Sequence, residues 1–110
     1  MSENNNEDSK MNYVYIVFIG KQVFQDNCER LYDQEILKVF FCQEKANVYA
    51  KNVIQEKLGN QYNENELVYT NENLFHYLCM DNEFYKNNGF HLKLWVQKHN
   101  IVDSTFSFSI

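Results

Sequence analysis

The sequence predicts a single two-layer α+β domain, in which a four-stranded, mainly antiparallel sheet carries one helix on one face. Two apolar runs precede a stretch with helical periodicity, and two more apolar runs follow it, which gives the order strand, strand, helix, strand, strand. The chain has 110 residues, enough for one domain of this kind and not for two. We expect the domain to span residues 12–101, after a disordered, acidic and Asn-rich tail at 1–11 and before an edge strand or loose tail at 102–110.

The first two strands are predicted from the apolar run YVYIVFIG at Tyr13–Gly20 and from a second run at about Leu31–Phe41, with the sequence QDN between them as a turn. Strands this close in the chain most simply form an antiparallel hairpin. Strict alternation along the second strand separates two sets of side chains: Glu35, Leu37, Val39 and Phe41 on one face, and Ile36, Lys38 and Phe40 on the other.

A helix is predicted at about Gln43–Leu58 because apolar residues recur there at steps of three and four. These residues are Ala46, Tyr49, Ala50, Val53, Ile54 and Leu58. Gly59 follows the last of them, at the position where a helix often ends with a residue in the left-handed conformation. Glycine adopts that conformation at the lowest energetic cost. We expect the apolar stripe to cover the sheet face that carries Leu37, Val39 and Phe41, which is the nearest apolar surface in the chain.

Two further strands are predicted after the helix. The segment NLFHYLCM at Asn73–Met80 fits either a helix or a strand, and we favour a strand because it is short, apolar on both faces and followed by the turn-like DNEFYKNNG. The segment FHLKLWVQKH at Phe90–His99 alternates strictly between apolar and mostly polar residues, as a strand does. Together these two strands would form a second hairpin.

Composition and charge exclude several classes of protein. The net charge is −5 and no run of Lys and Arg occurs, so binding to nucleic acid or to an anionic membrane is disfavoured. No apolar run approaches the ~20 residues of a membrane span, and the polar N-terminus has no signal-peptide pattern. The three cysteines, Cys28, Cys42 and Cys79, have no repeating spacing that would indicate a disulfide framework. We therefore expect a cytoplasmic protein.

No motif in the sequence predicts a catalytic residue, a cofactor or a metal ion. The nearest approach to a zinc-ligand pair is His76-x2-Cys79, whose side chains would point to opposite faces of a strand. Cys42 lies at the predicted start of the helix, where a thiol pKa falls, so it is a candidate reactive thiol if a His lies nearby. The plainer interpretation is that Cys42 is a capping or core residue.

The series YVYIVF, EILKVFFCQEKANVYA and GFHLKLWVQKH resembles small uncharacterised domains of fungi and other lower eukaryotes. In those domains a strand pair ends in V-F, a helix carries K-A-N-x-x-A and a late strand reads V-W-V-x-K. This chain departs from that pattern at Gln97, where an acid is usual, and in its middle segment. The resemblance implies the same order of strands and helix, and it implies no activity.

The sheet face that the single helix leaves uncovered is the most informative predicted feature. It would carry the interface candidates Ile36, Phe40 and Trp95, a larger apolar cluster than monomers usually expose. We hypothesise a protein-interaction or assembly module, with a second copy of the chain or an unidentified protein partner on this face. The chain's own residues 105–110 or the loop 60–72 are the alternative covers. The competing functional hypothesis is a small enzyme or ligand-binding protein with a reactive Cys or His.

Overall fold

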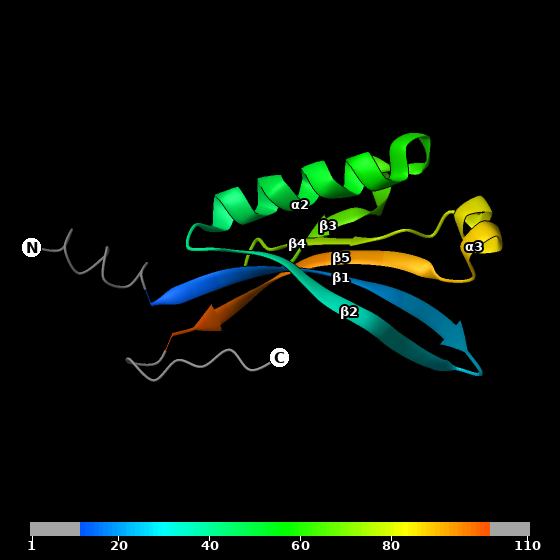
Figure 1. Cartoon of the computed structure of the whole chain (residues 1–110), viewed down its shortest axis with the longest axis horizontal. Coiled ribbons are helices and arrows are strands. Elements are labelled where there is room, and N and C mark those ends of the chain that lie inside the picture. The colour runs from blue at the N-terminus through cyan, green and yellow to red at the C-terminus, as the bar shows by residue number, and fades with distance from the viewer. Residues whose placement is uncertain (1–11, 102–110) are drawn as a thin grey trace, which may run out of the picture.

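The computed structural model describes residues 12–101, which form a five-stranded antiparallel sheet with one long helix on one face (Figure 1). In chain order the elements are β1 (Tyr13–Gln25), β2 (Cys28–Phe40), α2 (Gln43–Leu58), the 3-10 helices η1 (Gly59–Gln61) and η2 (Glu64–Glu66), β3 (Leu67–Tyr69), β4 (Phe75–Leu78), α3 (Asn82–Asn88) and β5 (His91–Asn100). The strands lie in the order β2-β1-β5-β4-β3. The α+β class and the antiparallel sheet are confirmed, whereas the sheet has five strands rather than four and a second short helix is present.

The first hairpin is confirmed and is longer than predicted. β2 begins at Cys28 rather than near Leu31, because Gln25 and Cys28 close the ladder around a two-residue turn. Both turn residues, Asp26 and Asn27, have positive φ angles, of 51° and 62°. Asp and Asn tolerate that conformation, and the resulting turn matches the right-handed twist of paired strands.

A β-bulge interrupts the alternation of side chains along β2. Val17 of β1 lies opposite Lys38, but the next residue, Phe18, lies opposite Ile36, so Leu37 is an extra residue in β2. A bulge places two successive residues of one strand against one residue of its partner, which shifts the side-chain phase on either side of it. Strict alternation therefore fails between the two halves of β2.

The bulge overturns the predicted positions of two residues. Phe40 lies opposite Tyr15, packs against the core beneath α2 and has its ring 5.4 Å from that of Tyr49. It therefore lies on the helix side and not on the uncovered face. Val39 was expected beneath the helix, but it lies opposite Ile16 and is 43% exposed. The prediction was wrong for both residues because it assumed an unbroken period of two.

The helix α2 has the predicted bounds and the predicted buried stripe. Its buried residues are Ala46, Ala50, Ile54 and Leu58. They pack against side chains from three strands, among them Val17, Phe75 and Leu94. Gly59 follows the helix as predicted, but with φ 54° and ψ −120° it adopts a conformation open to glycine that differs from the predicted left-handed one.

The second half of the sheet agrees with the prediction in its two main strands and differs in their connections. The segment around Asn73–Met80 contains strand β4, and β5 pairs with both β4 and β1. The expected turn between β4 and β5 is instead the short helix α3. Its N-cap residue is Asp81, whose side chain accepts a hydrogen bond from the Phe84 N–H at 2.9 Å. The strand β3, only three residues long, was missed in the polar connection.

The predictions for residues 1–11 and 102–110 lie outside the described residues. Among residues 12–101, none of the helices has the length and apolar character needed to cross a membrane.

Candidate interaction surface

One row of side chains runs across all five strands on the face of the sheet away from α2. From edge to edge it consists of Ile36, Phe18, Trp95, His76 and Val68. We call this side of the sheet the open face. Two of the three predicted interface residues, Ile36 and Trp95, thus lie in one row.

Trp95 lies at the centre of this row and contacts both Phe18 and Lys93. Its ring stacks on that of Phe18, with the centroids 5.3 Å apart and the planes 14° from parallel. The Lys93 ammonium lies 4.8 Å from the centre of the indole ring, within the range of a cation–π contact. The residue is only 7% exposed.

Two further residues of the open face are more deeply buried than Trp95. Ile16, opposite Gln97, is fully buried, and Val14, opposite His99, is 4% exposed. The loop 60–72, a predicted alternative cover for this face, does not lie over them. Its Tyr62 packs into the core beneath α2 and stacks on Tyr77 at 5.2 Å, while its strand β3 lies at the edge of the sheet.

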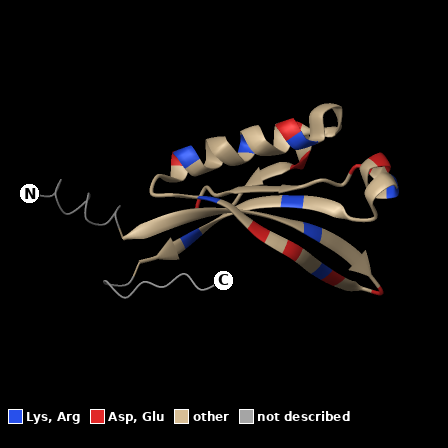
Figure 2. Ribbon diagram, in the orientation of Figure 1, with Lys and Arg blue, Asp and Glu red and all other residues tan. Residues whose placement is uncertain are grey.

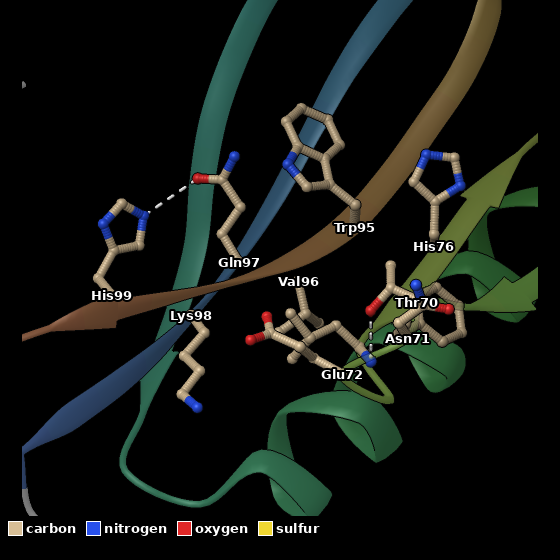
Figure 3. Close-up of a pocket in the computed structure, with 11 residues that line it drawn as sticks. Thr70, Asn71, Glu72, His76, Trp95, Val96, Gln97, Lys98 and His99 are labelled. Atoms are coloured by element: carbon tan, nitrogen blue, oxygen red, sulfur yellow. Dashed lines mark hydrogen bonds between the residues drawn. The ribbon is translucent and has the colours of Figure 1, made fainter.

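A notch opens beside the second half of β5 (Figure 3). The ladder between β4 and β5 ends where His76 lies opposite Trp95, but β5 continues to Asn100. The space left beside it is a cavity of about 650 Å³. Its lining residues are Thr70, Asn71, Glu72, Leu74, Phe75, His76, Trp95, Val96, Gln97, Lys98 and His99. We call this cavity the β5 notch.

The far wall of the notch is a loop that the start of α2 holds in place. The Gln43 side-chain amide donates to the backbone carbonyls of Glu72 and Asn73, at 2.7 and 2.8 Å. The Asn47 side chain donates to the Asn73 carbonyl at 2.9 Å and accepts from the Phe75 N–H at 3.0 Å. These bonds turn the chain out of the sheet at Phe75, which is why β4 does not accompany β5 further.

The side chains around the notch divide between the two faces of β5. His76, Trp95, Gln97 and His99 project to one side, and Lys98 projects to the other (Figure 3). His99 is hydrogen-bonded through Nε2 to the Gln97 Oε1 at 3.1 Å. Burial, and then the nearby Lys93 ammonium, hold the pKa of His76 below its ordinary value. His76 therefore lines the notch as a neutral imidazole at neutral pH.

Phe40, the third predicted interface residue, lines a separate groove between α2 and β2. The groove has a volume of about 460 Å³ and is lined by Lys38, Phe40, Glu44, Lys45, Val48, Tyr49 and Asn52. The Lys38 ammonium lies over the rings of both Phe40 and Tyr49, at 5.5 and 5.3 Å. The predicted set of three interface residues is therefore divided between two faces of the molecule.

The predicted chemical groups lie in three different parts of the fold: Cys42 before α2, His76 on the open face and Cys79 in the core. Cys42 is exposed and precedes α2 as its N-cap residue, as expected, and its reactivity stays a prediction. Cys79 is buried, and its burial raises the pKa of its thiol. His76 lies on the open face and Cys79 in the core on the other side. Within residues 12–101, His, Cys, Asp and Glu side chains form no group of three that could bind a metal ion.

A hydrogen-bond network around Tyr77 holds the connection after α2, and sequence reasoning missed it. The Tyr77 hydroxyl donates to Glu66 at 2.7 Å and accepts from the Asn63 N–H at 2.9 Å. The second oxygen of the Glu66 carboxylate accepts from the Met80 N–H at 2.8 Å. Burial and the Glu66 carboxylate both raise the pKa of Tyr77. From the sequence, an acid in a polar loop is expected to be a solvated charge. In the structure, Glu66 is instead a hydrogen-bond acceptor that holds the connection in place.

Comparisons with known proteins identify no family for this chain: no family model, no curated protein and no solved structure matches it. The resemblance to small fungal domains therefore stays a prediction.

Proposed function

We propose that this protein is a protein-interaction module that binds an extended segment of a partner protein in the β5 notch, by strand addition. The observation that carries the proposal is that β5 continues for five residues beyond Trp95, the last residue paired with β4. A partner segment would continue the sheet at that point, where the chain's own β4 turns away.

The direction of the backbone groups of β5 supports this proposal. The Cys79 N–H donates to the Leu92 carbonyl, and the Ile101 N–H donates to the Asn12 carbonyl near β1. In an antiparallel sheet the backbone groups of successive residues face alternate neighbours. Even-numbered residues of β5 therefore face the β4 side. Val96 lies next to the last ladder pair, so Lys98 and Asn100 are the residues that offer their backbone groups to the notch. Strand addition uses such groups for affinity and adjacent side-chain pockets for specificity.

The other edges of the sheet suit this role less well. The outer edge of β2 carries charged residues and two bulges, both of which oppose pairing with another strand. β3 offers an edge of only three residues. The notch has a wall already fixed by Gln43 and Asn47, so a bound segment would not have to order that loop.

Peptide selection followed by a backbone scan tests the proposal. Random peptides of about ten residues, displayed on phage and selected against the full chain, supply the probe. Selected peptides should bind in solution, and N-methylation should abolish binding at every second position only, because alternate N–H groups face β5. Binding that does not depend on the methylated position would exclude strand addition. A failure to enrich any peptide would refute the function.

A matched pair of variants places the binding at β5. Lys98→Pro removes a backbone N–H that faces the notch, whereas Lys98→Ala keeps it and removes only the side chain. We expect the first variant to lose peptide binding and the second to keep it, with circular dichroism confirming that both are folded. If the wild type forms dimers that Lys98→Pro dissociates, the partner segment belongs to a second copy of the chain.

A further inference from the structure

Three apolar residues of the open face are buried although α2 covers the other face. Ile16 has no exposed surface, and Val14 and Trp95 are 4% and 7% exposed. Among residues 12–101, the long helix and the loop after it lie on the opposite side, and α3 meets the far end of β5, at Phe90 and His91. These elements do not account for a cover over Val14 and Ile16.

The described part of the chain ends beside this strip of buried residues. The Ile101 N–H donates to the Asn12 carbonyl at 2.7 Å, next to the pair formed by Val14 and His99. Nine residues, VDSTFSFSI at 102–110, follow. Asp103 and Ser104 are residue types that favour a reversal of the chain. After such a reversal, the chain would run back along the open face.

The spacing of apolar residues in that segment matches the spacing of the strip. Phe106, Phe108 and Ile110 alternate with small polar residues, and an extended chain places alternate side chains about 6.6 Å apart on one side. Val14, Ile16 and Phe18 recur along β1 with the same two-residue step. Nine extended residues reach about 30 Å, more than the roughly 13 Å from the Val14 row to the Phe18–Trp95 row.

We propose that residues 105–110 of this chain cover the open face. Their three apolar side chains pack on the strip that runs from Val14 over Ile16 to Trp95. The open face is then an internal docking surface, and the β5 notch at the sheet edge is a separate site. This inference goes beyond the proposed function and does not depend on it.

The fluorescence of Trp95 tests the cover directly, because Trp95 is the sole tryptophan of the chain. In the full chain, the double substitution Phe106→Ser and Phe108→Ser should shift the emission of Trp95 to longer wavelength and increase its quenching by acrylamide. The control is Thr105→Ala with Ser107→Ala, which alters the same segment on its polar side and should change neither. If the double variant unfolds, the single substitution Phe108→Ser provides the same two readouts.

Three results would overturn the inference. The first is unchanged emission and quenching in folded Phe106→Ser/Phe108→Ser protein. The second is a protection of Trp95 that appears only at concentrations where sedimentation detects a dimer, since the cover would then be a second copy. The third is a loss of hydrogen-exchange protection at Lys98 and Asn100 in the variant, which would place the segment in the notch. The peptide-binding assay is independent, so the inference and the proposed function can fail separately.

Discussion

Tyr77 combines two roles that usually fall to different residues. Its ring is fully buried in the core beneath α2, and its hydroxyl joins Glu66 of η2 to the backbone N–H of Asn63. Because the hydroxyl is both donor and acceptor, its removal would leave a partly buried carboxylate and a backbone N–H without their partner. This one oxygen therefore helps to hold the segment between α2 and β3 in place, together with the Lys51–Glu64 ion pair.

We therefore expect Tyr77→Phe to lower the free energy of unfolding by about 1–3 kcal/mol, the usual cost of leaving buried polar groups unsatisfied. Urea denaturation of both proteins measures it. Tyr32→Phe is the control, because Tyr32 is 43% exposed and should cost little. Equal effects of the two substitutions would show that the hydroxyl of Tyr77 contributes nothing specific.

His76 should make the stability depend on pH. Its pKa in the folded protein is lowered by burial and by the Lys93 ammonium, so the unfolded chain binds a proton more readily. The stabilisation from neutral His76 is complete above its unfolded pKa of about 6.5 and is lost as the pH falls below that value. The melting temperature should thus fall from about pH 7.5 to about pH 5.5, and His76→Gln should reduce that fall. An identical pH profile in the variant would contradict this.

Among the elements, α2 offers the clearest test of packing. Ile54 is fully buried on the stripe, whereas Val48 on the same helix is 58% exposed. Ile54→Asp buries an unpaired carboxylate, which costs several kcal/mol out of a total stability of ~5–15 kcal/mol, so we expect the domain to unfold. Val48→Asp should cost far less, as judged by circular dichroism and thermal melting. Similar damage from both would show that the face assigned to the core is incorrect.

The same elements show which parts of the fold could be predicted from the sequence. The bounds of α2 and β5, and the presence of the first hairpin but not its length, follow from local patterns of apolar residues. The strand β3 and the helix α3 are short, with three and seven residues, and their formation depends on contacts such as the pairing of β3 with β4 and the Asp81 cap of α3. Local periodicity carries no signal of either contact.

The candidate site was predicted only where the side-chain period is unbroken. Trp95 lies on a strand without a bulge, so its face could be derived by counting residues. The face of Phe40 could not be derived in this way, because the extra residue Leu37 reverses the alternation of side chains. The local composition does not indicate that a bulge is present. The β5 notch depends on where β4 turns away from β5. That point is set by hydrogen bonds with Asn47, which is distant from β4 in the sequence, so the local pattern gives no indication of it.

At the scale of the whole molecule, the sheet has one long exposed edge, and its composition opposes self-association. β2 has 13 residues and carries acidic and basic side chains along its length (Figure 2). Two register shifts also interrupt its pairing with β1, which makes the edge irregular. Charges and bulges on edge strands hinder pairing with other chains.

We expect the double substitution Arg30→Val and Glu35→Val to promote association through this edge. Both residues are exposed on β2, and valine favours strands, so the monomer should remain folded while the edge loses two of its five charged side chains. Sedimentation velocity over a range of concentrations should detect oligomers in the variant at concentrations where the wild type has none. The matched control is Lys57→Val with Glu56→Val, which removes one charge of each sign from exposed positions on α2 and alters no strand edge. If the control associates as strongly as the β2 variant, general surface hydrophobicity is responsible and the edge is not.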